Sequence, residues 1–219
     1  MVLRVVVVGA GYAGVAAARV LVGGGVRVHL VDPRGVFEDA ERYPEVVSGK
    51  VLPRAISRRV SAMVLGVRVH KAAAVGIDRE RKEVLLSGKK RLAYDYCLLA
   101  VGHRPSRSDV PGLSAYASVV DSARSAHSVA EHMRHMFRSF RSFDGVRRKA
   151  ALTCVIAGSS RVACELAASL MDLLSALGRK HKVGADEPFV YLLVKGERVA
   201  PELPEREGRF LLEELERKE

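Results

Sequence analysis

The stretch VVVVGAGYAG, residues 5–14, is an unbroken apolar run that leads directly into the glycine pattern G-x-G-x-x-G. Such a run predicts a strand buried in a parallel sheet, and the glycines predict a phosphate-binding turn. Gly9 is expected to permit the tight turn, Gly11 to let the backbone approach a pyrophosphate, and Gly14 to let the next helix pack on the strand. The pyrophosphate would lie at the N-terminus of that helix. The candidate cofactor contacts of this stretch are Gly9, Gly11, Tyr12, Ala13 and Gly14.

The residues that follow complete a strand-helix-strand unit. A helix is predicted over 15–22, a glycine triplet at 23–25 ends it, and a second strand over 26–31 leads to Asp32. An acid at this place can hold a ribose 2′-hydroxyl. The strand, helix, second strand and acid together favour a dinucleotide or flavin nucleotide site over a unit with accidental glycines. Pro33 and Arg34 follow in the same turn, where Arg34 is either a phosphate contact or a solvated arginine.

Composition limits the class of protein. The 219 residues are 48% apolar, which is enough for one large globular domain or two small ones. No apolar run approaches a membrane span, and residues 2–8 are a strand interrupted by Arg4, not the apolar part of a signal peptide, so a cytoplasmic protein is expected. The net charge of +11 favours anionic partners. The basic residues are spread along the chain and aromatics are only 5%, which argues against a specific nucleic-acid surface.

Two features concern residue types. The chain contains no Asn, Gln or Trp, and it is rich in Arg, Glu, Val and Ala, which suggests a thermophilic source. Its three cysteines, Cys97, Cys154 and Cys164, are an odd number without a C-x-x-C pair, so neither a disulfide framework nor a zinc site is expected. Cys164 falls in a predicted first helical turn, where inert packing is favoured over a reactive thiol.

The middle of the chain reads as short elements. A short basic helix is predicted over 52–64, with Pro53 in its first turn. Three short strands are then predicted to form a small antiparallel meander, at residues 67–71, 73–77 and 83–86. The sequence YDYCLLAVG at 94–102 predicts another buried strand that ends on glycine.

The order of these features resembles the two-dinucleotide-binding-domain flavoproteins. The FAD half of that family ends a strand in YD-hydrophobic-ATG, and here Ala100, Val101 and Gly102 stand where A-T-G would. Within the family, YPEVVSGK at 43–50 is similar to the L-P-E-V-x-x-G segment of type II NADH dehydrogenases and their sulfide:quinone reductase relatives. The resemblance implies that Ala74 lies near the adenine of FAD, and that Ala100 and Gly102 belong to the same site with Gly102 near the phosphates.

A long amphipathic segment at 121–143 carries apolar residues at helical spacing. A helix that packs this stripe on the FAD domain is favoured over a helix that lies on a membrane surface. His132 and His135 share one face of the segment, but a metal site would need more ligands.

A second motif follows a predicted strand at 152–157. The sequence GSSRVACE at 158–165 resembles the family's NAD(P)H fingerprint, usually G-x-G-x-x-G-x-E. Gly158 matches, whereas Ser160 replaces a glycine and either obstructs the pyrophosphate or donates to a phosphate oxygen. The resemblance implies a catalytic role for Glu165 near the nicotinamide and flavin, and the alternative is an acid that complements the helix dipole.

Lys195 follows the second strand of this unit, predicted over 189–194, at the place where an acid normally binds the ribose of NAD. With Arg198 nearby, Lys195 is consistent with a 2′-phosphate and hence with NADPH. Loss of pyridine nucleotide binding explains the same substitution, and both alternatives stay open.

The predicted fold class is α/β: an FAD-type Rossmann domain, with a parallel sheet and a small antiparallel meander, plus an incomplete second Rossmann-type unit. The predicted boundaries are 1–115 for the FAD domain, 116–150 for the connecting helix and 151–219 for the NAD(P)H unit. The resemblance implies an FAD-dependent NAD(P)H oxidoreductase that passes electrons from a nicotinamide cofactor through FAD to a quinone or similar acceptor.

The alternative function is a non-catalytic nucleotide-binding fragment or subunit. The resemblance implies that about half of a family enzyme is present, so a truncated frame, a second chain that completes the fold, and a drift to binding without catalysis are all open. Membrane association would be at most peripheral, on the inner face. The predicted cofactors are FAD and NAD(P)H, with no metal.

Overall fold

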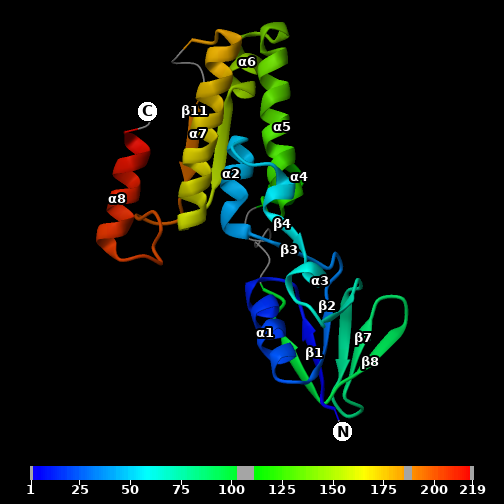
Figure 1. Cartoon of the computed structure of the whole chain (residues 1–219). Helices are drawn as coiled ribbons and strands as arrows, with labels where there is room; N and C mark the ends of the chain where they lie inside the picture. Colours follow the sequence, from blue (N-terminus) through cyan, green and yellow to red (C-terminus); the bar gives the residue numbers. More distant parts are fainter. Residues whose placement is uncertain (1, 103–110, 185–188, 218–219) are drawn as a thin grey trace. The chain divides into compact units, whose positions relative to one another are not determined.

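The computed structural model describes residues 2–102, 111–184 and 189–217, and it divides into two compact units (Figure 1). The first unit comprises residues 1–39 and 54–109, and the second comprises 40–53 and 110–219. The short segment 40–53 therefore groups with the C-terminal part of the chain. The boundaries expected from sequence, at 115 and 150, stay a prediction.

A parallel sheet forms the centre of the first unit. Its strands are β1 (Arg4–Val8), β2 (Arg27–Val31), β5 (Arg68–His70) and β9 (Tyr96–Leu99), in the order β5-β2-β1-β9. All three neighbouring pairs are parallel, and Val8 lies opposite Val31 in the register. The FAD-type α/β fold class predicted from sequence is confirmed by this sheet, by its helix and by the comparisons reported below.

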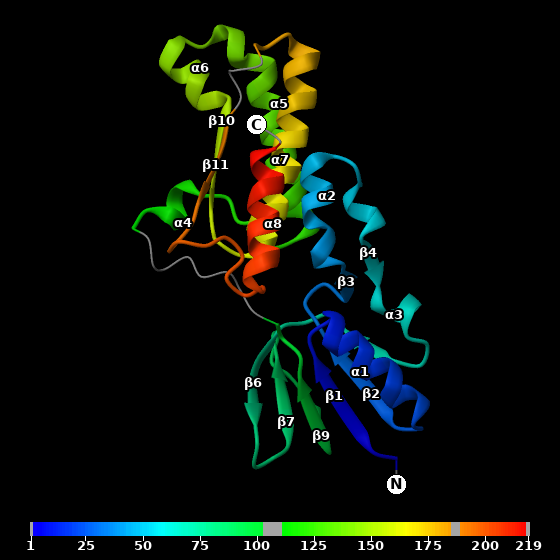
Figure 2. The ribbon, with the colours of Figure 1, turned by 90° about the vertical axis from the view of Figure 1, so that its left-hand side faces the viewer.

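The two faces of this sheet carry different layers (Figure 2). Val5 and Val7 pack with Val15 and Ala18 of α1 (Tyr12–Gly23) on one face. The even-numbered valines of β1, Val6 and Val8, point to the other face and pack against the meander. Because side chains alternate along a strand, a continuous run of valines supplies both layers at once.

The meander differs from the predicted one. It consists of β6 (Ala74–Asp78), β7 (Glu83–Leu86) and β8 (Lys90–Ala93), all antiparallel. The prediction that 67–71 is its first strand was wrong, because β5 pairs parallel with β2 and packs the half-buried Val69 against the main core. The strand β8 was not predicted, although Gly88 with φ +78° marks the turn before it.

Two further predictions were wrong. Residues 52–64 do not form one helix: they form the 3₁₀ turn η2 (Pro53–Ala55), the strand β4 (Ser57–Arg59) and the short helix α3 (Val60–Met63). The strand β4 pairs antiparallel with β3 (Val36–Glu38), and this pairing outweighs local helical preference. The strand β9 is not buried, since it ends the four-stranded order and leaves Leu99 60% exposed.

The second unit contains a smaller parallel sheet and several helices. Its sheet pairs β10 (Thr153–Ala157) with β11 (Phe189–Leu193). The other elements, in chain order, are η1 (Ala40–Arg42), α2 (Tyr43–Ser48), α4 (Leu113–Tyr116), α5 (Ala123–Ser139), η3 (Phe140–Ser142), α6 (Gly145–Ala151), α7 (Arg161–His181) and α8 (Glu205–Glu216).

The amphipathic segment forms α5, as its spacing predicts. Ser122 caps this helix by accepting the backbone N–H of Ser125, and the Ser125 side chain accepts the N–H of Ser122 in return. Its apolar stripe is buried, with Phe137 fully enclosed. The helix contacts α2 and α7 (Figures 1 and 2), and α2 comes from the segment that the sequence assigned to the FAD domain.

Two histidines on the neighbouring strands β2 and β5 contact each other in the first unit; His29 is buried and His70 is half-buried. His29 Nδ1 and His70 Nε2 are 2.8 Å apart and their rings are stacked. One nitrogen must donate and the other accept, so the contact requires at least one neutral ring. Burial lowers the pKa of both histidines, and the charges of Arg68 and of other bases add to this effect. The charged groups around the pair are Arg4, Arg27, Arg68 and Lys90.

We expect the first unit to lose stability as the pH falls below about 6.5, the usual pKa of an unfolded histidine. The folded pKa values are lowered, so the unfolded chain binds more protons and the stabilisation present above this pH is lost in acid. Urea unfolding at pH 7.5 and 5.5 measures the effect. His70→Gln should flatten the difference between the two pH values, whereas His132→Gln, at an exposed position on α5, should leave it unchanged. The prediction would be contradicted if the free energy of unfolding changed by the same amount between the two pH values in the wild type and in His70→Gln.

Candidate functional site

The first glycine turn is held by close backbone contacts. Gly9 has φ +108°, and a Cβ there would overlap the carbonyl oxygen of Ala100. A Cβ on Gly14 would overlap the carbonyl oxygen of Gly9. Both positions therefore need glycine to keep α1 packed against the end of β1, as the spacing predicts.

Gly11 is different, because the protein itself does not require it. Its φ of −76° suits any residue, and apart from its two neighbours in the chain no described residue has an atom within 4 Å of where its Cβ would stand. Gly11 is the N-cap of α1 and offers no side chain to the free N–H groups of the first turn. An open helix N-terminus of this kind suits an anion, so the turn fits the pyrophosphate of a dinucleotide.

Asp32 lies at the carboxyl end of β2, beside this turn. Its carboxylate accepts the backbone N–H groups of Ala10 at 3.3 Å, Arg34 at 2.9 Å and Gly35 at 2.8 Å. These bonds fix the carboxylate at the strand end, which is the place expected for a ribose contact. The Arg34 guanidinium forms an ion pair with Glu38 at 2.6 Å and is half exposed, and its contact with a phosphate stays a prediction.

The other predicted FAD contacts spread over the first unit. The Tyr12 hydroxyl donates to Asp39 and its ring packs edge-on against Phe37. Ala74 begins β6 and packs against the core under the meander. Ala100 donates its N–H to the Val8 carbonyl at 2.8 Å and lies against the glycine turn. The remaining candidates, Ala13, Pro33 and Gly102, are exposed.

The second turn repeats the local geometry of the first. Gly9 donates its N–H to the carbonyl of Val31 at 2.8 Å, and Gly158 donates to that of Leu193 at 2.9 Å. The strand ends pair in the same way, with Ala157 opposite Leu193. This register places Val194, not Lys195, at the position that Asp32 occupies in the first unit, with Lys195 exposed one residue beyond.

The N-terminus of α7 is already bonded to oxygen atoms of the chain. Ser160 is its N-cap, and the Ser160 hydroxyl accepts the N–H of Ala163 at 3.4 Å. The N–H of Arg161 donates to the Glu202 carboxylate at 2.6 Å, and this bond lowers the pKa of Glu202. Sequence reasoning missed Glu202, since the carboxylate comes from a loop 41 residues away.

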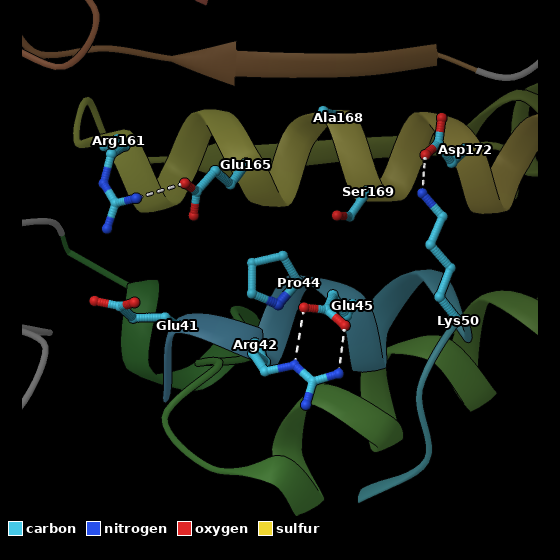
Figure 3. Close-up of a pocket in the computed structure, with 10 residues that line it drawn as sticks. All are labelled: Glu41, Arg42, Pro44, Glu45, Lys50, Arg161, Glu165, Ala168, Ser169 and Asp172. Atoms are coloured by element: carbon cyan, nitrogen blue, oxygen red, sulfur yellow. Dashed lines mark hydrogen bonds and ion pairs between the residues drawn. The ribbon is translucent and has the colours of Figure 1, made fainter. Parts of the chain in front are cut away.

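A cavity of about 470 Å³ lies between α2 and α7 in the second unit (Figure 3). Three ion pairs surround it: Arg42 with Glu45, Lys50 with Asp172, and Arg161 with Glu165, each at 2.8 Å. Arg42 lowers the pKa of Glu45, and Asp172 raises the pKa of Lys50. The remaining lining residues are Glu41, Pro44, Ala168 and Ser169.

Glu165 therefore lines a polar cavity rather than only the helix surface. Its carboxylate is bonded to Arg161, four residues earlier on α7, and it faces the segment 43–50 that the family resemblance singled out. The individual residues Arg42, Glu45, Lys50 and Asp172 were not predicted. Arg42 and Glu45 form a local pair three residues apart, whereas the pairing of Lys50 with Asp172 depends on how α2 packs on α7.

The three cysteines are free, and each has a raised pKa. Burial raises the pKa of Cys97 and raises that of Cys154 to about 11. For Cys164, burial is the main cause, followed by the nearby charges of Glu202 and Glu165. A raised pKa keeps a thiol protonated and unreactive at neutral pH. Among the described residues, no group of three His, Cys, Asp or Glu side chains is arranged to hold a metal.

In the part of the chain that the structure describes, every helix is too short or too polar to cross a membrane.

A family model described as pyridine nucleotide-disulphide oxidoreductase matches residues 3–219. The external alternative NAD(P)H-ubiquinone oxidoreductase B4 of Arabidopsis thaliana is 27% identical over 187 residues, which cover 78% of this chain and 32% of that protein. The ferroptosis suppressor protein 1 of Taeniopygia guttata is 36% identical over 121 residues, covering 54% and 30%. The chain thus spans about a third of the length of these relatives.

Solved structures agree on the fold. The structure of NDH2 from Plasmodium falciparum in complex with NADH superposes with a TM-score of 0.92 at 16% identity, over 100% of this chain and 47% of that one. The sulfide:quinone oxidoreductase of Aquifex aeolicus superposes with a TM-score of 0.75 at 17% identity, over 99% and 49%. The chain therefore corresponds to about half of these folded proteins.

We expect Gly14→Ala to destabilise the first unit by roughly 1–3 kcal/mol, because its Cβ would overlap the Gly9 carbonyl oxygen. Gly11→Ala should cost less than about 1 kcal/mol, since its Cβ would enter open space. Urea unfolding followed by circular dichroism measures both changes. A larger loss for Gly11→Ala than for Gly14→Ala would show that the turn is packed differently.

We expect Cys154 and Cys164 to be alkylated by iodoacetamide at pH 7.5 at least about tenfold more slowly in the folded chain than in guanidinium, because both thiols stay protonated and partly or fully buried. Mass spectrometry of timed samples measures the rates at each site. Rapid labelling of Cys164 in the folded chain would instead indicate a reactive thiol at the start of α7.

Proposed function

Because the chain belongs to the pyridine nucleotide-disulphide oxidoreductase family, we propose that it acts as an FAD-dependent NAD(P)H oxidoreductase, with FAD on the first unit and NAD(P)H on the second. The observation that carries this proposal is the open turn at Gly11, which the protein's own packing leaves free beside the fixed carboxylate of Asp32. Both cofactors are consistent with the family match and with the NADH complex among the structural neighbours.

In this proposal the first unit holds FAD through its backbone. The N-terminus of α1 would bind the pyrophosphate, Gly11 would allow it to come close, and Asp32 would accept from a ribose hydroxyl. Ala74 and Gly102 would lie along the same cofactor, as the family resemblance implies. When bound, FAD would supply the redox chemistry, so the protein needs no nucleophile of its own. The raised pKa values of Cys154 and Cys164, which keep these thiols protonated, are consistent with a reaction that uses no protein nucleophile.

The second unit would bind the nicotinamide cofactor. Gly158 and α7 form the turn for its pyrophosphate, and Glu165 would orient the nicotinamide end from the wall of the cavity. The basic residues Lys195 and Arg198 favour NADPH. Val194 supports the same choice, because it stands where NADH-binding proteins usually have a carboxylate for the ribose. The name of the Arabidopsis relative, an NAD(P)H-ubiquinone oxidoreductase, supports a quinone as the electron acceptor.

The alternative is a nucleotide-binding subunit that needs a second chain for turnover. Exposed apolar residues on two strands favour it. On β9 they are Tyr96, Leu98 and Leu99, and on β11 they are Phe189, Tyr191 and Leu193. Uncovered apolar strands of this kind are typical of surfaces that another segment covers. This second candidate shares the cofactor sites of the first and differs only in turnover by the chain alone.

We expect the purified chain to show the visible absorption bands of flavin after incubation with FAD and gel filtration, and to lose them on anaerobic addition of NADPH or NADH. Gly11→Ala should reduce retained FAD at least about tenfold, because its Cβ would enter the space for the pyrophosphate. Gly23→Ala is the matched control, since that glycine ends the same helix and also faces open space.

The outcomes separate the two candidates. Flavin bands that bleach with either nucleotide support the oxidoreductase. Flavin bands that persist with both nucleotides support the binding subunit. A colourless protein, or equal FAD retention in Gly11→Ala and Gly23→Ala, would overturn the assignment of FAD to the first unit.

A further inference from the structure

The loop between β11 and α8 lies over the second glycine turn. Ala200 donates its N–H to the carbonyl of Ser159, and Glu202 accepts the N–H of Arg161 at 2.6 Å. Val199 and Ala200 are buried, and a Cβ on Gly208 of α8 would stand 3.0 Å from the Val199 carbonyl oxygen. The loop is thus fixed between the start of α7 and the side of α8.

The backbone of this loop is held in a costly conformation. Ala200 has φ +44°, in the left-handed region that residues other than glycine rarely adopt. The Leu203 N–H donates to the Ala200 carbonyl at 2.9 Å, and Leu203 in turn accepts from the Arg198 guanidinium at 3.1 Å. These contacts hold the loop that carries Glu202, and its exposed side chain reaches the N-terminus of α7 from there.

The backbone N–H that donates to Glu202 lies where a bound dinucleotide would place its pyrophosphate. Arg161 is the first residue of α7 after its N-cap, and Tyr12 holds the same place in α1. A pyrophosphate at a helix N-terminus bonds to N–H groups of this first turn. The other N-terminal bond of α7 is supplied by Ser160, where the first unit has the open Gly11.

We propose that Glu202 is an internal anion that closes the second dinucleotide site, and that a pyridine dinucleotide must displace this carboxylate to bring its pyrophosphate onto α7. The inference rests on the proposed function, because it takes the second unit as the NAD(P)H site. Two anions cannot share one helix N-terminus without strong repulsion, so the bound carboxylate lowers the affinity for the phosphate. The restraint acts on the second site alone. The first glycine turn is open to its cofactor, whereas the Glu202 carboxylate lies on the second turn until a dinucleotide displaces it.

The test measures binding of ADP-ribose, which carries the adenosine and pyrophosphate but no nicotinamide and therefore cannot reduce a flavin. Isothermal titration calorimetry on the full chain, saturated with FAD, compares the wild type with Glu202→Gln and Glu202→Ala. Both variants remove the negative charge, and the glutamine keeps the size of the side chain. We expect each variant to bind ADP-ribose about tenfold more tightly than the wild type does. For NADPH, too, both variants should bind more tightly than the wild type.

Glu197→Gln is the matched control. It removes the same charge from the same loop, and Glu197 is exposed. Its affinity for ADP-ribose should equal that of the wild type. Any binding at the first unit is common to all four proteins and cancels in the comparison.

Two results would overturn the inference. Equal affinity in all four proteins would show that Glu202 does not compete with the phosphate, while leaving the proposed NAD(P)H site intact. No binding by any of the four, up to about 10 mM ligand, would reject both the restraint and the nucleotide role of the second unit. The FAD assignment is judged separately, by the flavin bands of the same samples.

Discussion

The contact of the Gly9–Gly14 turn with its neighbours is the constraint on which the first unit depends. Gly9 lies against the Ala100 carbonyl and Gly14 against the Gly9 carbonyl, so neither tolerates a side chain. Because the strands are parallel, their carboxyl ends share one edge, and Gly9, Asp32 and Ala100 all emerge there. The same close packing that joins helix to sheet thus directs the N-terminus of α1 toward the site.

The parts of the fold predicted from sequence are those that local pattern determines. Four valines before a glycine specify β1, and the spacing of apolar residues specifies α5. Residues 57–59 carry the polar sequence Ser-Arg-Arg and no strand pattern, so only their pairing with β3 makes them a strand. In the same way β5 is a short apolar stretch whose partner, β2, is chosen by packing on the core.

In the candidate site, too, some residues follow from local sequence pattern and others are brought together only by the fold. The glycines and Asp32 were found from spacing alone, because the βαβ unit places them by its own geometry. The shift from Lys195 to Val194 needed the register of β10 with β11, which the sequence does not reveal. Glu202 lies 41 residues from Arg161 and follows no motif, so only the folded loop brings the two together. The pair of Lys50 with Asp172 at the cavity likewise depends on α2 packing against α7.

The segment 40–53 has a consequence for how the chain can be divided. The helix α2 has six residues, too few to be stable by itself, and it is held by α5 and α7, which lie far along the sequence. A fragment that starts after residue 110 would expose the faces that α2 covers, and a fragment that ends there would carry α2 without support. The two units are therefore interleaved along the chain, and neither can be expressed or excised as a single continuous stretch.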